Sequence, residues 1–299
     1  MKRAVSVSLG SSSRNKHVIV DLKGQTISLE RIGTDGDVAA ARRKFAELDG
    51  NVDVLGVGGV DLNLYLGERR YPLHAAQKLV QDVHKTPVVD GSGLKHTLER
   101  RVFELAAPAL GGVPHFHKAF VTMAVDRPGL AQAVAAVADE VIFGDFMFGL
   151  DLPIPLKGLR QLHLALRIML PFVSHFPMSM IFYGSSGKEY TPKFTRYWQA
   201  ADLIAGDFLF MKKYMPQDLS GKTVVTNTTT AENVEALRAR GVTRLITTTP
   251  RYEGRSFGTN MMEAALTAYA GLGRVLTRTE LNALIDELGL RSTVEMLNP

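Results

Sequence analysis

Residues 178–207, MSMIFYGSSGKEYTPKFTRYWQAADLIAGD, contain the pattern that decides the expected fold. The apolar run Met178–Tyr183 ends abruptly at a glycine-rich segment, which predicts a buried strand followed by a tight loop. Thr191-Pro192 is typical of a helix N-cap and first helical residue, and predicts a helix through Trp198. A second apolar run, Leu203–Ala205, predicts a strand that ends at Gly206-Asp207.

The order strand, glycine loop, helix, strand and acid is that of a nucleotide-binding unit. In such units the loop N–H groups and the helix N-terminus hold phosphates, and an acid about 20 residues further on accepts ribose hydroxyls. Asp207 lies 23 residues after Gly184, so we expect pyrophosphate at the loop and ribose at Asp207. An ordinary strand–helix turn is the alternative, because the full G-x-G-x-x-G is absent. The loop consists of Gly184, Ser185, Ser186, Gly187 and Lys188.

The composition excludes several classes of function. With 299 residues the chain is long enough for two domains. It has no cysteine, which excludes disulfides, thiolate nucleophiles and cysteine-ligated metals. The net charge of +5 comes from 35 basic and 30 acidic residues that are spread along the chain, so we expect no nucleic-acid partner, whereas an anionic small-molecule substrate suits the charge. His115 and His117 have no carboxylate at ligand spacing, so we expect no metal.

The apolar segments indicate a protein that does not enter a membrane. Residues 4–9 are too short a run for the core of a signal peptide. The longest apolar region, residues 159–183, is interrupted by Arg160, Arg167 and His175, which argues against a membrane span. We therefore expect a cytoplasmic location, and the sequence leaves a homo-oligomer open.

Alternating strand and helix patterns along the chain predict an α/β fold, with mostly parallel sheets covered by helices on both faces. Residues 1–150 are expected to form an N-terminal substrate-type domain with β-hairpins. Residues 151–275 are expected to form a Rossmann-like nucleotide-binding domain. Residues 276–299 should form a C-terminal amphipathic helix, which begins at the capping box Thr277-x-x-Glu280. A second glycine loop, Gly56–Asp61, ranks below the Gly184 loop, because a predicted hairpin follows it.

Ligands of open α/β sheets bind beyond the carboxyl ends of the strands, which selects the candidate site residues. In the first half these positions carry carboxylates and a lysine, which suit proton transfer. In the second half they carry hydroxyls and amides, which suit phosphates and ribose. The first-half candidates are Asp61, Asp90, Ser92, Lys95, Asp126 and Asp145; those of the second half are the Gly184 loop, Asp207, Thr226, Asn227, Thr228, Thr248, Thr249 and Pro250.

The segment from Asp90 to Lys95, DGSGLK, is the candidate for catalysis. Its glycines let the backbone approach a ligand, and Lys95 stands near a helix N-terminus, where the helix dipole does not favour a cation. The alternative is a surface lysine beside a glycine turn. Two further segments, 138–148 (ADEVIFGDFMF) and 200–210 (AADLIAGDFLF), share strand, Gly-Asp and Phe-x-Phe positions, either through duplicated strand–helix units or through convergence on a common pattern.

The stretches TPVVDGSGLKHTLERR (86–101), ADLIAGDFLFMKKYMP (201–216) and LITTTPRYEGRSFGTNMMEA (245–264) resemble a bacterial family usually labelled quinate 5-dehydrogenase. More distantly, VLGVGGV and TTP-x-x-x-G are similar to motifs of shikimate and quinate dehydrogenases. This resemblance implies a substrate domain followed by a dinucleotide domain, with a Lys–Asp pair that assists proton transfer. The sequence departs from those enzymes in its early glycine motif.

These observations predict an oxidoreductase that uses NAD or NADP on a small hydroxylated, anionic substrate of the quinate or shikimate type. Lys95 and Asp90 would be catalytic, and Thr248, Thr249 and Pro250 would lie on the nicotinamide side. The alternative is a nucleotide- or phosphate-ligand-binding protein, or a transferase, without redox chemistry.

Overall fold

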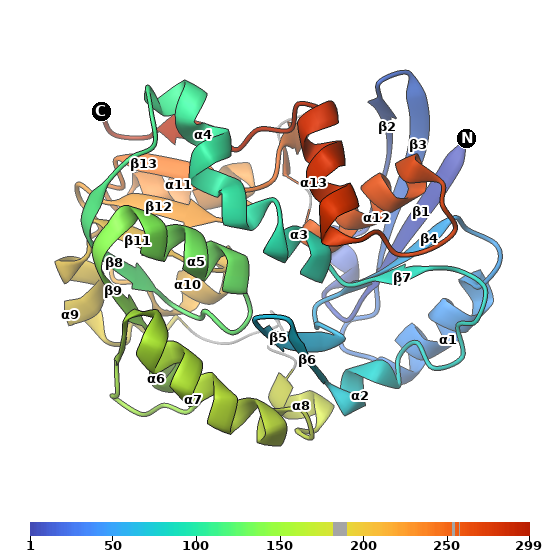
Figure 1. Ribbon diagram of the computed structural model, residues 1–299, viewed down its shortest axis with the longest axis horizontal. Helices are drawn as coiled ribbons and strands as arrows, with labels where there is room; N and C mark the ends of the chain where they lie inside the picture. The colour runs from blue at the N-terminus through green and yellow to red at the C-terminus, as the bar shows by residue number, and fades with distance from the viewer. Residues whose placement is uncertain (182–189, 253–254, 257) are drawn as a thin grey trace. The chain divides into compact units, whose positions relative to one another are not determined.

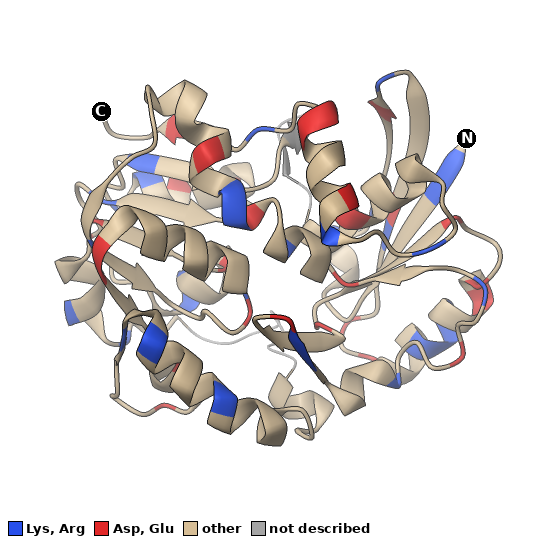
Figure 2. Ribbon diagram, in the orientation of Figure 1, with Lys and Arg blue, Asp and Glu red and all other residues tan. Residues whose placement is uncertain are grey.

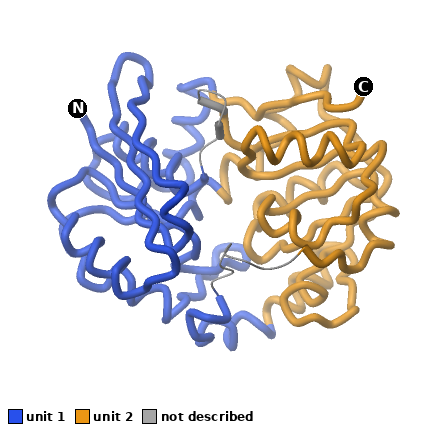
Figure 3. The backbone as a smooth tube through the Cα atoms, turned by 180° about the vertical axis from the view of Figure 1, so that it is seen from behind, with its two compact units in different colours: residues 1–94, 168–187, 258–289 blue, residues 95–167, 188–257, 290–299 orange. Residues whose placement is uncertain are grey.

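The computed structural model describes residues 1–181, 190–252, 255–256 and 258–299. The described chain divides into two compact units (Figure 3). The first contains residues 1–94, 168–187 and 258–289, and the second contains residues 95–167, 188–257 and 290–299. This division differs from the consecutive ranges 1–150, 151–275 and 276–299, because sequence patterns reveal elements but not the sheet that each element joins.

The first unit is built on a sheet with the strand order β2-β3-β1-β4-β7 (Figure 1). β1 is parallel to β3 and β4, β4 is parallel to β7, and β2 is antiparallel to β3. The helix α12 packs on β1, β3 and β4. The predicted hairpins are present as β2–β3 and β5–β6, so a hairpin does follow the Gly56–Asp61 loop.

The elements of the first unit, with the helices α3 and α7 that cross into the second, are β1 Lys2–Ser8, η1 Ser12–Arg14, β2 Lys16–Leu22, β3 Gln25–Gly33, α1 Val38–Leu48, β4 Val54–Gly58, β5 Asn63–Leu66, β6 Arg69–Pro72, α2 His74–Gln77, β7 Val88–Val89, α3 Ser92–His96, α7 Gly158–Val173, α8 Met178–Ile181, α12 Thr259–Ala270 and α13 Arg278–Glu287.

The second unit is built on a sheet with the order β10-β9-β8-β11-β12-β13-β16. Its central strands, from β9 to β13 in this order, are parallel, and the edge strands β10 and β16 are antiparallel to their neighbours. α4 and α5 cover one face, and α9, α10 and α11 lie on the other (Figure 1). Parallel sheets flanked by helices confirm the predicted α/β class.

The remaining elements of the second unit are η2 Glu99–Arg101, α4 Val102–Leu110, β8 Phe116–Val121, α5 Pro128–Val137, β9 Ala138–Phe143, α6 Asp145–Gly149, β10 Leu156–Lys157, α9 Thr195–Ala200, β11 Leu203–Ala205, α10 Phe208–Tyr214, β12 Thr223–Thr226, α11 Ala231–Arg238, β13 Arg244–Thr247, β14 Arg251–Tyr252, β15 Arg255–Ser256 and β16 Thr293–Met296.

Aromatic side chains fill the core on the α10 side of this sheet. Phe120 from β8 meets Trp198 edge to face, with ring centroids 5.3 Å apart, and Phe148 and Phe208 are buried in the same cluster. Trp198 Nε1 donates to the Lys193 carbonyl at 3.0 Å, so the polar end of the indole is satisfied. Trp198 is therefore a packing residue that fixes α9 against β8.

The segment around residue 180 corrects the sequence-based expectation. Met178–Ile181 is the helix α8 and not a strand, because Pro177 begins a helical turn and its carbonyl accepts from Met180 N at 2.9 Å. Thr191-Pro192 does not begin a helix either. Thr191 N donates to the Lys213 carbonyl at 2.9 Å, which holds this segment beside the end of α10, and α9 begins only at Thr195.

At the C-terminus, the capping box of Thr277 and Glu280 is present and α13 is confirmed. The expected single helix over 276–299 is wrong beyond Glu287, because Thr293–Met296 forms β16 along β13.

Candidate functional site

The strand order of the second unit creates a switch point between β8 and β11. From β8 the chain goes to β9 on one side, and it later returns to β11 on the other side of β8. The connections therefore leave these neighbouring strands in opposite directions, and ligands of open α/β sheets bind in the crevice that results. We therefore expect a ligand site among the residues that follow β8 and β11.

Arg127, which follows β8, is the centre of a charged cluster at this switch point. Its Nη1 donates to Glu99 Oε1, its Nη2 donates to Asp207 Oδ2 at 2.8 Å, and its Nε lies 3.3 Å from Asp126 Oδ2. Lys95 completes the group, because its Nζ donates to Asp126 Oδ1 at 2.8 Å. We call Lys95, Glu99, Asp126, Arg127 and Asp207 the Arg127 cluster.

Asp207 ties this cluster to the neighbouring strands. As the N-cap of α10, it accepts at Oδ1 from Leu209 N at 3.0 Å and from Phe210 N at 3.3 Å. Its Oδ2 accepts from Arg127 and, at 2.8 Å, from Asn227 Nδ2. Thr249 Oγ1 donates to the Asn227 carbonyl at 2.9 Å. Polar residues that follow β8, β11, β12 and β13 thus form one connected network.

Two glycines allow the close contacts that bring the segments of the cluster together. A Cβ on Gly129, at the start of α5, would lie 1.9 Å from the Lys95 carbonyl oxygen. Gly206 has a φ of +154°, and a Cβ there would lie 2.1 Å from Thr122 Oγ1. Since no flexible side-chain end can yield at Gly129, glycine is required there for α5 to approach the segment that carries Lys95.

The cluster has a buried cationic side and a partly exposed acidic side. The side chains of Lys95 and Arg127 are 6% and 5% exposed, whereas those of Asp126 and Asp207 are 36% and 27% exposed. Glu99 is fully buried, and burial raises its pKa, although Arg127 and then Lys95 act in the opposite direction. A ligand would therefore contact the carboxylates of Asp126 and Asp207. The buried side chains of Lys95 and Arg127 hold these carboxylates in position.

Asp145 holds the loop after β8 from the β9 side. Its Oδ2 accepts from Ala124 N at 3.1 Å, and its Oδ1 accepts from Val125 N at 2.8 Å. Burial raises the pKa of Asp145 to about 6, the backbone hydrogen bonds oppose this shift, and the charge of Asp126 adds to it. Asp145 therefore fixes the backbone that leads to Asp126, and its carboxylate faces that backbone.

Asp90 and Lys95, which were expected to act in one loop, have different surroundings. Asp90 accepts at Oδ2 from Leu62 N at 2.7 Å and at Oδ1 from Ser92 N at 3.0 Å. The boundary between the units follows Leu94, so Asp90 belongs to the first unit and Lys95 to the second. The carboxylate that lies beside Lys95 within its own unit is Asp126.

Some of the expected cofactor-binding residues lie in the part of the chain that the structure describes, and others do not. Thr226 Oγ1 donates to the Gly206 carbonyl at 2.8 Å, and Thr248 Oγ1 is buried without a hydrogen-bond partner within the described chain. Pro250 follows at the same edge, after β13. Gly184, Ser185, Ser186, Gly187 and Lys188 lie outside the described residues, and the element before them is α8 and not the expected strand.

Asp207 does not fit the predicted ribose role in this arrangement. The backbone of α10 occupies Oδ1, and the side chains of Arg127 and Asn227 occupy Oδ2. A carboxylate has about four acceptor positions, so a ribose diol, which donates two hydrogen bonds, would have to displace two of these donors, whereas a single hydroxyl would displace only one. The described residues consequently offer no ready dinucleotide site at Asp207.

Glu99 and Arg127 were missed in the sequence. The sequence does contain a signal for Arg127. It stands after a strand and directly before Pro128, the proline that begins α5. Glu99 gives no such signal. It stands in the run Leu98-Glu99-Arg100-Arg101, which has the composition of an exposed helical turn. Its burial depends on the contact with α5, which only the fold reveals.

The described residues contain neither a metal site nor a membrane-spanning helix. No group of histidine, aspartate and glutamate residues in the described ranges could hold a metal ion, and none of the described helices is long and apolar enough to cross a membrane. Charges of both signs are interspersed along the ribbon (Figure 2).

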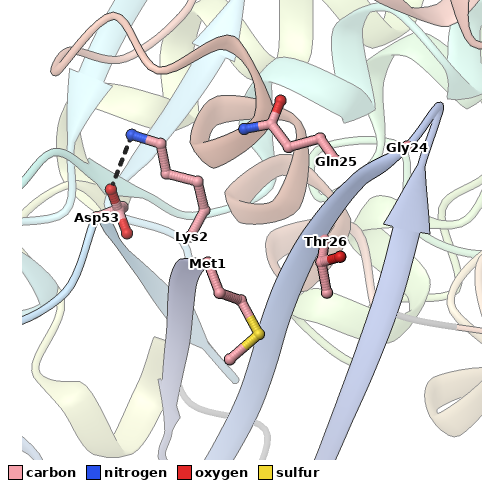
Figure 4. Close-up of a pocket in the computed structure, with 6 residues that line it drawn as sticks. All are labelled: Met1, Lys2, Gly24, Gln25, Thr26 and Asp53. Carbon is pink, nitrogen blue, oxygen red and sulfur yellow. Dashed lines mark hydrogen bonds and ion pairs between the residues drawn. The ribbon is translucent and has the colours of Figure 1, made fainter.

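An open recess of about 630 Å³ lies between the start of β1 and the β2–β3 turn (Figure 4). Its ionic groups, Lys2 and Asp53, already pair with each other at 3.1 Å. The recess is lined by Met1, Lys2, Gly24, Gln25, Thr26 and Asp53.

Comparisons with known proteins give families without a known function. Residues 93–297 match the family model described as "Domain of unknown function (DUF8754)", and residues 3–90 match the one described as "Domain of unknown function (DUF8753)". No curated protein matches the chain.

Similar solved structures include a Mycobacterium smegmatis protein at 11% identity, with 96% of this chain and 94% of that chain covered and a TM-score of 0.31. They also include aspartate transcarbamoylase from Trypanosoma cruzi, in complex with carbamoyl aspartate and phosphate, at 10% identity. There the match covers 92% of this chain and 83% of that chain, with a TM-score of 0.34.

Proposed function

We propose that this chain, which belongs to the family described as "Domain of unknown function (DUF8754)", binds a small hydroxylated molecule at the Arg127 cluster. The observation that carries the proposal is a pair of partly exposed carboxylates, Asp126 and Asp207, which buried cations hold beside the switch point of a parallel sheet. Carboxylates accept hydrogen bonds from hydroxyl groups, and charge-assisted bonds of this kind are strong. A fixed pair can select a ligand by the spacing of its hydroxyls, one of which would replace Asn227 Nδ2 at Asp207 Oδ2.

Lys95 serves this site as a cation. Its Nζ donates to Asp126 Oδ1 at 2.8 Å, so Lys95 is a positioning residue for that carboxylate. Its charge, with that of Arg127, offsets the negative charge that Asp126 and Asp207 present to a ligand. A hydroxylated acid of the quinate or shikimate type, which the sequence resemblance suggests, would bring its hydroxyls to these carboxylates and hold its own carboxylate away from them.

The redox form of the proposal requires NAD or NADP as a second ligand. It rests on the resemblance to quinate dehydrogenases and remains a prediction, as does a cytoplasmic location. A binding protein or a transferase would use the same carboxylates without hydride exchange. Absorbance in the reduced-nicotinamide band during incubation with substrate and NAD or NADP distinguishes the redox form from the others.

Calorimetric titration with a panel of hydroxylated ring acids tests the binding step. We expect saturable binding of at least one member, and affinity about 10-fold or more lower in Asp126→Asn, since a hydrogen bond to a charged acceptor is lost. The matched control is Asp139→Asn, an exposed aspartate of the same unit that pairs with His115 and His117. Equal affinities in wild type and Asp126→Asn would overturn the proposal.

A further inference from the structure

A cluster of basic residues lies at the carboxyl ends of β1 and β3 in the first unit. Residues 9–15 lead from the end of β1 to β2, which lies beyond β3 in the sheet. Gly33 at the end of β3 makes room for this crossing, because a Cβ there would lie 2.5 Å from the Ser11 carbonyl oxygen. The crossing segment therefore lies at the edge of the sheet where ligands of α/β proteins bind.

Arg14 and Arg31 bring their guanidinium groups to one place on this segment. A Cβ on Gly10 would lie 2.5 Å from Arg14 Nη2 and 3.0 Å from Arg31 Nη2. Arg31 also donates to Ser8 Oγ and to the Ser11 carbonyl, each at 3.0 Å, so its guanidinium is held in position. Glycine at position 10 thus lets both guanidinium groups lie against the backbone.

Arg31 carries its charge in surroundings that disfavour it. Burial and then the charge of Arg14 lower the pKa of Arg31 to about 10, while Asp35 acts in the opposite direction. Asp35 also accepts from Ser12 N at 2.7 Å. Lys16 is directly opposite Arg31 in the β2–β3 register and adds a further positive charge.

We infer that Arg14 and Arg31, with the serine hydroxyls of the Gly10–Ser13 segment, bind the phosphate group of a small molecule. Guanidinium groups match phosphate oxygens in geometry and charge, and an anion between them relieves their repulsion. Ser11 and Ser13, whose hydroxyl oxygens are 2.8 Å apart, supply further donors. The inference concerns the first unit and does not depend on the function proposed for the Arg127 cluster.

Calorimetric titration of the full chain with inorganic phosphate, and separately with malonate as a carboxylate probe, tests this site. We expect saturable phosphate binding that is tighter than malonate binding. Arg14→Gln should weaken it about 10-fold or more, because an exposed side chain that makes a charge-assisted bond is removed. Gly10→Ala keeps every charge but displaces the Arg14 and Arg31 Nη2 atoms, and should weaken it as well.

The control variants separate a built site from general charge. Arg43→Gln removes an exposed arginine of α1 in the same unit and should leave phosphate binding unchanged. Asp207→Ala in the second unit should leave it unchanged too, so failure of the Arg127 proposal would not affect this result. Absence of saturable phosphate binding, tighter binding of malonate, or equal losses in Arg14→Gln and Arg43→Gln would overturn the inference.

Discussion

Two strand-to-helix connections of the second unit, which we call the Asp145 corner and the Asp207 corner, share a sequence pattern. The aspartates of the two corners accept hydrogen bonds from different partners. β9 leads through Gly144-Asp145 into α6, and β11 leads through Gly206-Asp207 into α10. Asp145 accepts from backbone N–H groups of the loop after β8 and is buried. Asp207 caps its own helix and also accepts from side chains that follow β8 and β12.

The place of the strand in the sheet explains this difference. β9 lies between β8 and the edge strand β10, and the Asp145 carboxylate accepts from the backbone of the β8 loop. β11 lies at the switch point, where connections diverge and side chains of several loops converge. The same local pattern therefore produces a scaffold residue at one corner and a candidate ligand-binding residue at the other.

The largest expected effect is on stability and comes from Arg127, the residue that distinguishes the Asp207 corner. Arg127→Met removes the cation whose Nη1 donates to the fully buried Glu99. Loss of one partner of a buried pair costs about 3–5 kcal/mol, so urea denaturation should show a decrease in unfolding free energy of this size.

Two further variants give this prediction its controls. Arg127→Met combined with Glu99→Leu should recover most of the loss, because replacement of a whole buried pair by apolar residues is often neutral. Arg196→Met removes an exposed arginine of α9 and should cost less than about 1 kcal/mol. Equal losses in Arg127→Met and Arg196→Met would show that Arg127 does not organise the corner.

The second prediction concerns the pH dependence of the unfolding free energy that Asp145 causes. The pKa of Asp145 is raised from 3.8 to about 6, so the folded state holds its proton where the unfolded state has lost it. Stability from this group is therefore present below pH 3.8 and is lost as pH rises through about 6, an effect of about 3 kcal/mol. Asp145→Asn should lack this decline in urea denaturation at a series of pH values. Parallel curves for the two proteins would contradict the assignment.

The third prediction compares the corners by ligand affinity. With the ring acid identified by titration, Asp207→Ala should bind about 10- to 150-fold more weakly, because a charged acceptor is removed. Asp145→Asn should change affinity by far less, since its carboxylate faces the backbone of the β8 loop. The comparison fails if Asp145→Asn loses affinity as strongly as Asp207→Ala.

The smallest expected effect concerns Lys95. Lys95→Met keeps most of the side-chain volume but removes the donor that orients Asp126. Affinity for the same ring acid should decrease about 10-fold, and the melting temperature should change little, because Asp126 is partly exposed and can be solvated. A large decrease in melting temperature with unchanged affinity would make Lys95 a structural residue.

Local patterns in the sequence predicted much of the fold. The hairpins of the first unit, the strand β11 and the capped helix α13 follow directly from alternation, apolar runs and N-cap residues. Strand-end positions also identified Asp126, Asn227 and Asp207, because the carboxyl edge of a sheet is fixed once its strands are known.

The rest depends on contacts between distant parts of the chain. The sequence order of Asp90 and Lys95 suggested one loop, but the boundary between units falls between them. The pairing of Arg127 with Glu99 and Asp207 joins residues 28 and 80 positions apart, which no local pattern encodes. Met178–Ile181 was misread because an apolar run of this length suits a strand or a helix, and Pro177 decides for the helix.

A crystal structure with the ring acid of highest affinity tests the central claim most directly. The account predicts ligand hydroxyl oxygens within hydrogen-bond distance, about 2.5–3.0 Å, of the carboxylates of Asp126 and Asp207. The Arg127 pairs with Glu99 and Asp207 should remain in place. A ligand bound away from both carboxylates, for example at the Gly56–Asp61 loop of the first unit, would contradict it.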